Sequence, residues 1–276
     1  MTQSLLEHLD DVTRAVTGAA RILLLLDFDG TLAPIVERPE LAKLPQATRS
    51  LLLALDAEPR VSVAVISGRS LADLRKRVGL ELIFAGNHGL EIEAPGLTFR
   101  PPDLTGTQPL MPTLASDLSK RLAAINGVLV ENKGPSLSIH YRNVNDERVA
   151  DVLDAVTSAW TPHSQLLELH KGKKVLEIRP RVEWNKGKAA QWILEHVGDE
   201  GVLPVCIGDD TTDEDIFRAL PDSISIKVGE EDTAARYRVS TPEQVRLFLH
   251  EILTAVQNAG SANSPRNHVT RNEDFA

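Results

Sequence analysis

Four acidic residues follow two apolar stretches of the sequence, at the points where strands would end. Asp27 and Asp29 come directly after ILLLL, and Asp209 and Asp213 come after VLPVCI. Because the carboxyl ends of parallel strands meet at one edge of a sheet, we expect these carboxylates to converge. Converging carboxylates repel one another unless a cation lies among them, and Mg²⁺ is the usual hard cation for carboxylate, water and phosphate oxygens. The spacing therefore predicts a Mg²⁺ site that takes a phosphorylated ligand.

A hydroxyl and a lysine are expected to join this edge. Ser67 follows the apolar run VSVAVI, and Lys186 stands at the start of a helix opened by Asn185, where backbone N–H groups favour an anion. Asp27 could attack phosphorus and form an aspartyl-phosphate, while Lys186 and the metal cancel charge on the equatorial oxygens and Ser67 donates a hydrogen bond. Asp29 could then protonate the leaving alkoxide and later take a proton from the hydrolytic water.

A glycine and an acid-rich run lie beside these residues. Gly30 removes a side chain where the backbone must approach the phosphate. The acid-rich run DDTTDED could instead be a calcium loop, but Glu214 stands where that loop requires glycine and Leu220 where it requires a bidentate glutamate. The calcium reading is therefore rejected.

The elements that must position these residues alternate between apolar strands and helices. This alternation is typical of a parallel sheet with crossover helices, and so of an α/β fold. Ser70 with Asp73, then Gly79, brackets one helix; another runs from Asn185 to near Gly198, and a third opens at TPEQ. The strands are expected at 22–26, 61–66, 82–85, 202–207 and 224–228.

The middle of the chain has a different pattern, which predicts a smaller inserted α/β domain. A proline-rich connection, RPPDLTGTQPLMP, is followed by a pattern of helix, two strands, helix and two strands. The helices are expected near 113–125 and 145–160, and the strands near 127–132, 136–142, 165–170 and 174–179. We assign residues 1–106 and 181–257 to a discontinuous core, 107–180 to the inserted domain, and 258–276 to a disordered tail.

Charged residues alternate along the strands of the inserted domain. Glu131 and Lys133 share one face, His140 and Arg142 share another, and Glu177 is paired with Arg179 in the same way. A solvated sheet face would show the same alternation, so periodicity cannot decide whether these residues bind a ligand. In the motif GNHGLE, His88 is equally compatible with a tight turn and with a ligand contact.

Four short motifs resemble those of the haloacid dehalogenase-like phosphatases: DFDGTL at 27–32, SGR at 67–69, NKG at 185–187 and GDDTTDED at 208–215. Together with GNHGLE, ENKGPSLSIHYR and KKVLEIRP, they resemble the trehalose-6-phosphate phosphatases over roughly residues 22–250.

The resemblance implies a Rossmann-like core and a mobile cap formed by the inserted domain. It also implies that Asp27 is the nucleophile and Asp29 the acid/base. Asp29 would ligate Mg²⁺ through its backbone carbonyl, so that its carboxylate stays free. Asp27 and Asp209 would ligate the metal as well, with Asp213 close by.

The resemblance further implies the substrate. In this family a Glu-x-Lys and a Glu-x-Arg of the cap bind the sugar, and a disaccharide rich in hydroxyl groups requires such clustered donors and acceptors. The expected reaction is Mg²⁺-dependent hydrolysis of trehalose 6-phosphate to trehalose and phosphate. A phosphatase of sucrose phosphate or mannosyl-phosphoglycerate, and a non-catalytic sugar-phosphate sensor, are the alternatives. The expected substrate-binding residues are Arg69, Asn87, His88, Glu91, Glu131, Lys133, Arg142 and Glu177.

Composition limits the classes of partner. A net charge of −9 disfavours nucleic acid, and the sequence has no apolar run long enough to cross a bilayer. The N-terminal stretch reads as an amphipathic helix and not as a secretory signal, so we expect a cytoplasmic protein. The one cysteine, Cys206, lies in an apolar run and is read as a core residue. We expect a monomer that acts on a small molecule.

Overall fold

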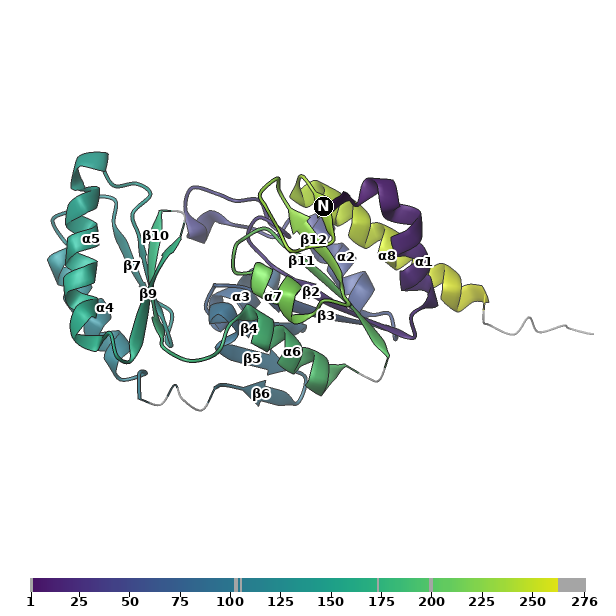
Figure 1. Cartoon of the computed structure of the whole chain (residues 1–276), viewed down its shortest axis with the longest axis horizontal. Helices are drawn as coiled ribbons and strands as arrows, with labels where there is room; N and C mark the ends of the chain where they lie inside the picture. The colour runs from purple at the N-terminus through teal and green to yellow at the C-terminus, as the bar shows by residue number, and fades with distance from the viewer. Residues whose placement is uncertain (1, 102–103, 105, 173, 199–200, 263–276) are drawn as a thin grey trace, which may run out of the picture.

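The computed structural model describes residues 2–101, 104, 106–172, 174–198 and 201–262. Two sheets lie side by side, the smaller one on the left in Figure 1 and the larger one in the centre. Helices α1 and α8 lie at the end of the molecule away from the smaller sheet. In the part of the chain that the structure describes, no helix combines the length and the apolar character needed to cross a membrane.

The larger sheet has nine strands in the order β1-β13-β12-β11-β2-β3-β4-β5-β6. Neighbours from β1 to β4 run parallel, and β5 and β6 add an antiparallel edge. The five strands predicted from the sequence are confirmed. The strands are β1 (Gln3–Ser4), β2 (Arg21–Leu26), β3 (Val61–Ile66), β4 (Ile83–Gly86), β5 (Glu91–Ala94), β6 (Leu97–Phe99), β11 (Val202–Gly208), β12 (Ile224–Val228) and β13 (Tyr237–Val239).

Helices cover both faces of this sheet, because its central strands are apolar on both sides. In β2, Ile22, Leu24 and Leu26 point to one core cluster, while Leu23 and Leu25 point to the other. The first cluster is covered by α1 (Leu9–Gly18), α2 (Gln46–Asp56), α3 (Leu71–Val78) and α8 (Pro242–Ala262), the second by α6 (Lys186–Val197) and α7 (Glu214–Ala219). Three-residue 3₁₀ turns lie at Leu6–His8, Pro39–Leu41, Asn87–Gly89 and Thr161–His163.

Three helix ends lie where the capping residues of the sequence predicted them. The Ser70 hydroxyl accepts a hydrogen bond from the Asp73 backbone N–H, and Gly79 ends α3 in the left-handed conformation. The Asn185 side chain accepts from the Lys188 backbone N–H, which starts α6. Cys206 is a buried core residue.

The smaller sheet is antiparallel, with the strand order β7-β8-β10-β9. One face packs on α4 (Leu110–Arg121) and α5 (Asp146–Trp160) in a third core cluster. The opposite face carries Glu131, Ser138, Glu177 and His170 in register across the sheet. The strands are β7 (Leu129–Asn132), β8 (Leu137–His140), β9 (Leu167–Gly172) and β10 (Val175–Pro180).

Three sequence predictions about element limits are wrong. The disordered tail was expected from residue 258, but α8 continues to Ala262, and 263–276 lie outside the described residues. Strand β8 ends at His140, which leaves Arg142 exposed in the following turn. The N-terminal stretch begins with β1, a two-residue strand paired in parallel with β13, before α1 starts at Leu9.

Candidate active site

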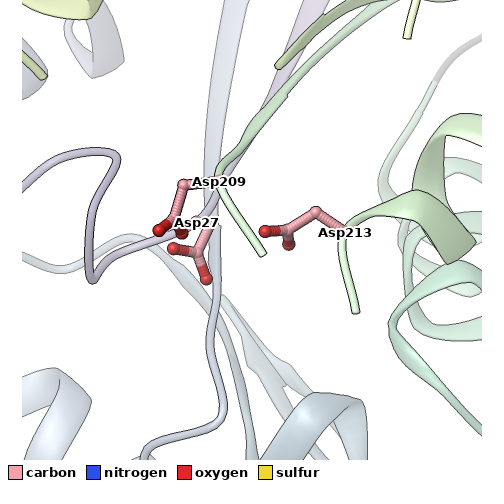
Figure 2. Close-up of side chains that lie close together, drawn as sticks. All are labelled: Asp27, Asp209 and Asp213. Carbon is pink, nitrogen blue, oxygen red and sulfur yellow. The ribbon is translucent and has the colours of Figure 1, made fainter. Parts of the chain in front are cut away.

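The predicted acidic cluster forms at the carboxyl edge of the larger sheet. Strands β11, β2 and β3 are neighbours, so the residues that follow them, Asp209, Asp27 and Ser67, meet at one edge. Asp27, Asp209 and Asp213 each offer one carboxylate oxygen, and these atoms lie within 4.8 Å of one another. Figure 2 shows the carboxylate of Asp213, which precedes α7, directed toward the other two.

Lys186 lies against this cluster and is 2% exposed. Its Nζ donates to Asp27 Oδ1 and to Asp213 Oδ1, each at 2.7 Å. Burial lowers the pKa of Lys186, but the charges of Asp213 and Asp27 outweigh burial and raise it above its usual value. The ammonium group therefore stays charged.

One lysine does not neutralise the buried carboxylates. Burial raises the pKa of Asp27 well above its usual value, and although Lys186 opposes this, Asp213 and Asp209 add to the rise. Burial and Asp213 raise the pKa of Asp209 to about 7. Among the described residues, the buried Asp209 Oδ1 has no hydrogen-bond partner. Repelling carboxylates with an unpartnered oxygen fit a divalent cation, the ligand that oxygen-rich clusters bind.

Gly30 leaves room for a carboxylate, where the sequence analysis expected phosphate. Its backbone has φ of +84°, and a Cβ there would lie 2.1 Å from Asp209 Oδ2. A side chain at position 30 would therefore displace Asp209. The glycine of the DFDGTL motif is needed because Asp209, which follows the neighbouring strand β11, occupies that space.

Asp213 has no oxygen free of protein donors. Oδ1 accepts from Lys186, and Oδ2 accepts from the backbone N–H of Asp210 at 3.0 Å. The residue is fully buried. Asp213 therefore orients Lys186 and adds negative charge beside Asp27.

The Asp29 carboxylate forms a two-point ion pair with Arg69. Arg69 Nε lies 2.6 Å from Asp29 Oδ2, and Arg69 Nη2 lies 2.6 Å from Oδ1. Ser67 is 2% exposed, and its hydroxyl accepts from the backbone N–H of Arg69. The sequence analysis assigned Arg69 to the substrate and missed this pair, since residues 29 and 69 are joined only by packing.

Glu177 is the centre of a second polar cluster, on the face of the smaller sheet that lies toward the larger one. Its carboxylate accepts from Lys133 Nζ (3.3 Å), Ser138 Oγ (3.1 Å) and Arg179 Nη2. Burial raises the pKa of Glu177, but His88, Lys133 and Arg179 outweigh burial and lower it well below its usual value. The charge alternation seen in the sequence thus belongs to a half-buried polar face that lies toward the larger sheet.

Two more residues of the smaller sheet form a pair of their own. Glu131 Oε2 and His140 Nε2 are 3.0 Å apart. Burial raises the pKa of Glu131, while His140 and Lys133 lower it, with a net fall.

Asn87 of the GNHGLE motif links the larger sheet to the hairpin between β7 and β8. Asn87 is fully buried; its amide nitrogen donates to Glu91 (2.8 Å) and to the Lys133 carbonyl, and its oxygen accepts from Ser136 (2.8 Å). Glu91 also accepts from Arg100. Asn87 and Glu91 are therefore hydrogen-bonded within the protein, and their expected contact with substrate stays a prediction.

His88 adopts a left-handed backbone, with φ of 58°, which is uncommon outside glycine. Arg179 Nη2 lies 2.6 Å from its Nε2, and Glu177 Oε2 lies 3.3 Å from the same nitrogen. Burial lowers the pKa of His88 to about 4; Glu177 opposes this, and Arg179 and Lys186 add to the fall. The ring is therefore neutral near pH 7.

A cleft of about 450 Å³ opens between the two sheets. Three of its lining residues carry buried polar atoms that have no partner among the described residues: His88 Nδ1, Arg179 Nε and Thr212 Oγ1. An N–H donor and a hydroxyl left unpaired fit a ligand that is rich in oxygen. The sequence analysis missed Glu168, His170, Trp184 and Thr212 in this lining.

Lys227 is a further residue that sequence reasoning missed. It lies in β12, is 3% exposed, and donates to the backbone carbonyl of Asp209. A lysine inside the strand ISIKV was a weak signal, but a charged residue in an otherwise apolar buried strand requires a partner.

The chain is similar to known proteins both in sequence and in fold. The profile of the trehalose-phosphatase family matches residues 25–251. A trehalose-phosphate phosphatase of Mycobacterium tuberculosis is 38% identical over 244 residues, which cover 84% of this chain and 61% of the relative. One of Mycobacterium avium is 37% identical over 267 residues, covering 90% of this chain and 67% of the relative. The C-terminal domain of the Candida albicans trehalose-6-phosphate phosphatase has the same fold, with a TM-score of 0.77, 23% identity, and coverage of 92% of this chain and 98% of that one.

The chain thus spans about three fifths of the length of the Mycobacterium tuberculosis relative that it matches. The family profile covers most of the chain, and its limits enclose the acidic cluster, Lys186, both sheets' facing surfaces and the cleft between them. On the strength of this match, the chain belongs to the trehalose-phosphatase family.

Proposed function

We propose that this chain is a Mg²⁺-dependent phosphatase that hydrolyses trehalose 6-phosphate to trehalose and inorganic phosphate. One observation carries the proposal: Asp27 ends a buried strand with its carboxylate against a charged lysine, beside two further carboxylates. A nucleophilic carboxylate and a fixed cation at one edge suit phosphoryl transfer. The names of the relatives support the choice of sugar.

In the first step, an Asp27 oxygen forms a bond to phosphorus as the bond from phosphorus to the sugar oxygen breaks. Asp29 gives its proton to the departing alkoxide, which leaves as trehalose. In the second step, water attacks the aspartyl-phosphate, Asp29 takes the water proton, and phosphate leaves with Asp27 regenerated. Lys186 stabilises the negative charge of the transferring group throughout.

The metal ligands would be Asp27, the backbone carbonyl of Asp29 and Asp209. Bound there, Mg²⁺ would supply positive charge to the phosphoryl oxygens. Asp213 would act through Lys186, because both of its oxygens already accept hydrogen bonds.

Residues 107–180 would serve as a cap over the core formed by 1–106 and 181–257. The sugar would lie between the sheets, against the polar face of the cap that carries Glu131, Lys133 and Glu177. To bind sugar, these side chains must exchange their present partners for hydroxyl groups. A cytoplasmic location, a monomeric state and the exclusion of nucleic acid stay predictions from the sequence.

Phosphate release from a panel of esters tests this proposal. The panel contains trehalose 6-phosphate, sucrose phosphate, mannosyl-phosphoglycerate and p-nitrophenyl phosphate, each with Mg²⁺ and with EDTA. We expect trehalose 6-phosphate to give the highest kcat/KM, EDTA to abolish release, and added Mg²⁺ to restore it. A different preferred ester would correct the substrate. Binding of trehalose 6-phosphate without release of phosphate would make the chain a sensor.

A further inference from the structure

Arg69 is held on three sides by other parts of the core. Besides its two bonds to Asp29, Nη1 donates to Asp73 Oδ2 at 2.7 Å and Nη2 donates to the Pro39 carbonyl at 3.0 Å. Its guanidinium also lies over the ring of Phe28, 5.3 Å from the ring centre. The residue is 8% exposed. A side chain that is held this way cannot turn to a substrate without losing several charge-assisted hydrogen bonds.

The pairing with Asp29 is the two-point geometry that fixes a carboxylate most firmly. Both Asp29 oxygens face two nitrogens of one planar guanidinium, so the plane of the carboxylate is set as well as its position. The Asp29 side chain is 38% exposed, so without Arg69 little else would restrict it.

Asp73 extends this restraint into helix α3. Its Oδ2 accepts from Arg69 and also from Arg77 Nε at 2.6 Å, one turn further along the helix. The orientation of Asp29 is thereby tied to the start of α3, the helix that follows Ser67 and its loop.

We propose that Arg69 is a positioning residue that fixes the carboxylate of the acid/base Asp29, and that it does not bind the substrate. This inference rests on the proposed function for the role of Asp29. Both bonds to Arg69 favour the charged carboxylate, so Asp29 must release one of them to take up the proton that it gives to the leaving oxygen. A general acid that starts from one defined orientation reaches that oxygen more often than one that samples many.

A double-mutant cycle on kcat and KM tests the role of Arg69. With the sugar phosphate that the wild type hydrolyses fastest, we expect Arg69→Met to lower kcat by about 10- to 100-fold and to leave KM within about twofold. In an Asp29→Asn background, the same substitution should cost nothing further, because the group it positions is gone. Arg69→Lys keeps the positive charge but cannot bind both Asp29 oxygens through two nitrogens, so its kcat should lie between those of the wild type and Arg69→Met. If the losses of kcat in the two single variants multiplied in the double variant, or if Arg69→Met raised only KM, the proposal would be overturned.

Two controls separate this outcome from general damage. Arg75→Met removes an arginine of α3 that pairs with Glu93, away from the acidic cluster, and should leave kcat unchanged. With p-nitrophenyl phosphate, whose leaving group does not need a proton, the loss caused by Arg69→Met should be smaller than with the sugar phosphate.

A structural readout keeps the proposal testable apart from the proposed function. In a crystal structure of Arg69→Met, we expect the Asp29 carboxylate to occupy a new rotamer or several rotamers. An unchanged Asp29 would overturn the positioning role even if trehalose 6-phosphate were hydrolysed. Conversely, a displaced Asp29 in a protein that releases no phosphate would uphold the pairing and refute the proposed function.

Discussion

At the scale of single residues, Asp27 gives the sharpest test of the proposed chemistry. Its carboxylate is 4% exposed, and burial with two neighbouring acids raises its pKa. Asp27→Asn keeps the shape of the side chain but removes the nucleophile, so turnover should fall by at least about a thousandfold. The thermal midpoint should be unchanged or higher, because a repelled charge is removed. Asp222→Asn, at an exposed acid, is the matched control, and ordinary turnover by Asp27→Asn would reject the assigned nucleophile.

His88 predicts how stability depends on pH. Its pKa is about 4 in the folded protein, against a usual value of 6.5, because burial, Arg179 and Lys186 disfavour the charged ring while Glu177 opposes them. Between about pH 4 and pH 6.5, His88 therefore binds a proton in the unfolded chain but not in the folded protein. Stability from this group is complete above about pH 6.5 and falls as the pH drops toward about 4, by at most about 3 kcal/mol.

Urea unfolding at several pH values in this window measures that loss. His88→Asn should remove this part of the slope, since asparagine also accepts a left-handed backbone and does not titrate there. An NMR titration of the His88 ring checks the assignment directly. A midpoint near pH 6.5 in the folded protein would contradict the buried neutral ring.

At the scale of elements, the contact between β4 and α3 limits what can stand at position 86. A Cβ on Gly86 would lie 2.5 Å from the backbone nitrogen of Leu71, at the first turn of α3. Gly86→Ala should therefore lower the free energy of unfolding by about 2–4 kcal/mol, because a backbone cannot yield as a side chain can. Gly18→Ala, where no atom lies within 4 Å, is the control and should change it by no more than about 0.5 kcal/mol. If chemical denaturation gave equal changes for Gly86→Ala and Gly18→Ala, α3 would be able to shift away from the added methyl group and the prediction would be wrong.

At the scale of the whole molecule, the proposed reaction would be divided between two sheets. The proposed phosphoryl transfer would take place at the core edge, whereas Glu131 lies on the polar face of the smaller sheet. Glu131→Ala should lower kcat/KM for trehalose 6-phosphate by about 10- to 100-fold and leave that for p-nitrophenyl phosphate within about threefold, because a small aryl ester does not reach the cap. Steady-state kinetics on both esters decide the matter, with exposed Glu243→Ala as control. Equal losses on both would show that Glu131 does not select the sugar.

The sequence by itself determined the parts that depend on neighbours along the chain. The five central strands follow from continuous apolar runs, and the ends of α3 and α6 follow from Ser70, Gly79 and Asn185. The meeting of Asp27, Asp209 and Lys186 also followed, because parallel strands of this order end at one edge. Motif order was enough to place the chain in its family.

Tertiary structure alone decided which polar groups meet. Arg69 pairs with a residue 40 positions earlier, and Arg179 with a histidine 91 positions earlier. The same alternating charges on β7 and β10 would suit a solvated sheet, and only the packing of the two sheets left them half-buried. The hydrogen bonds of Asn87 and Glu91 within the protein likewise depend on that packing. Side-chain pairing over such separations depends on how whole elements pack, and no local pattern of residues records that.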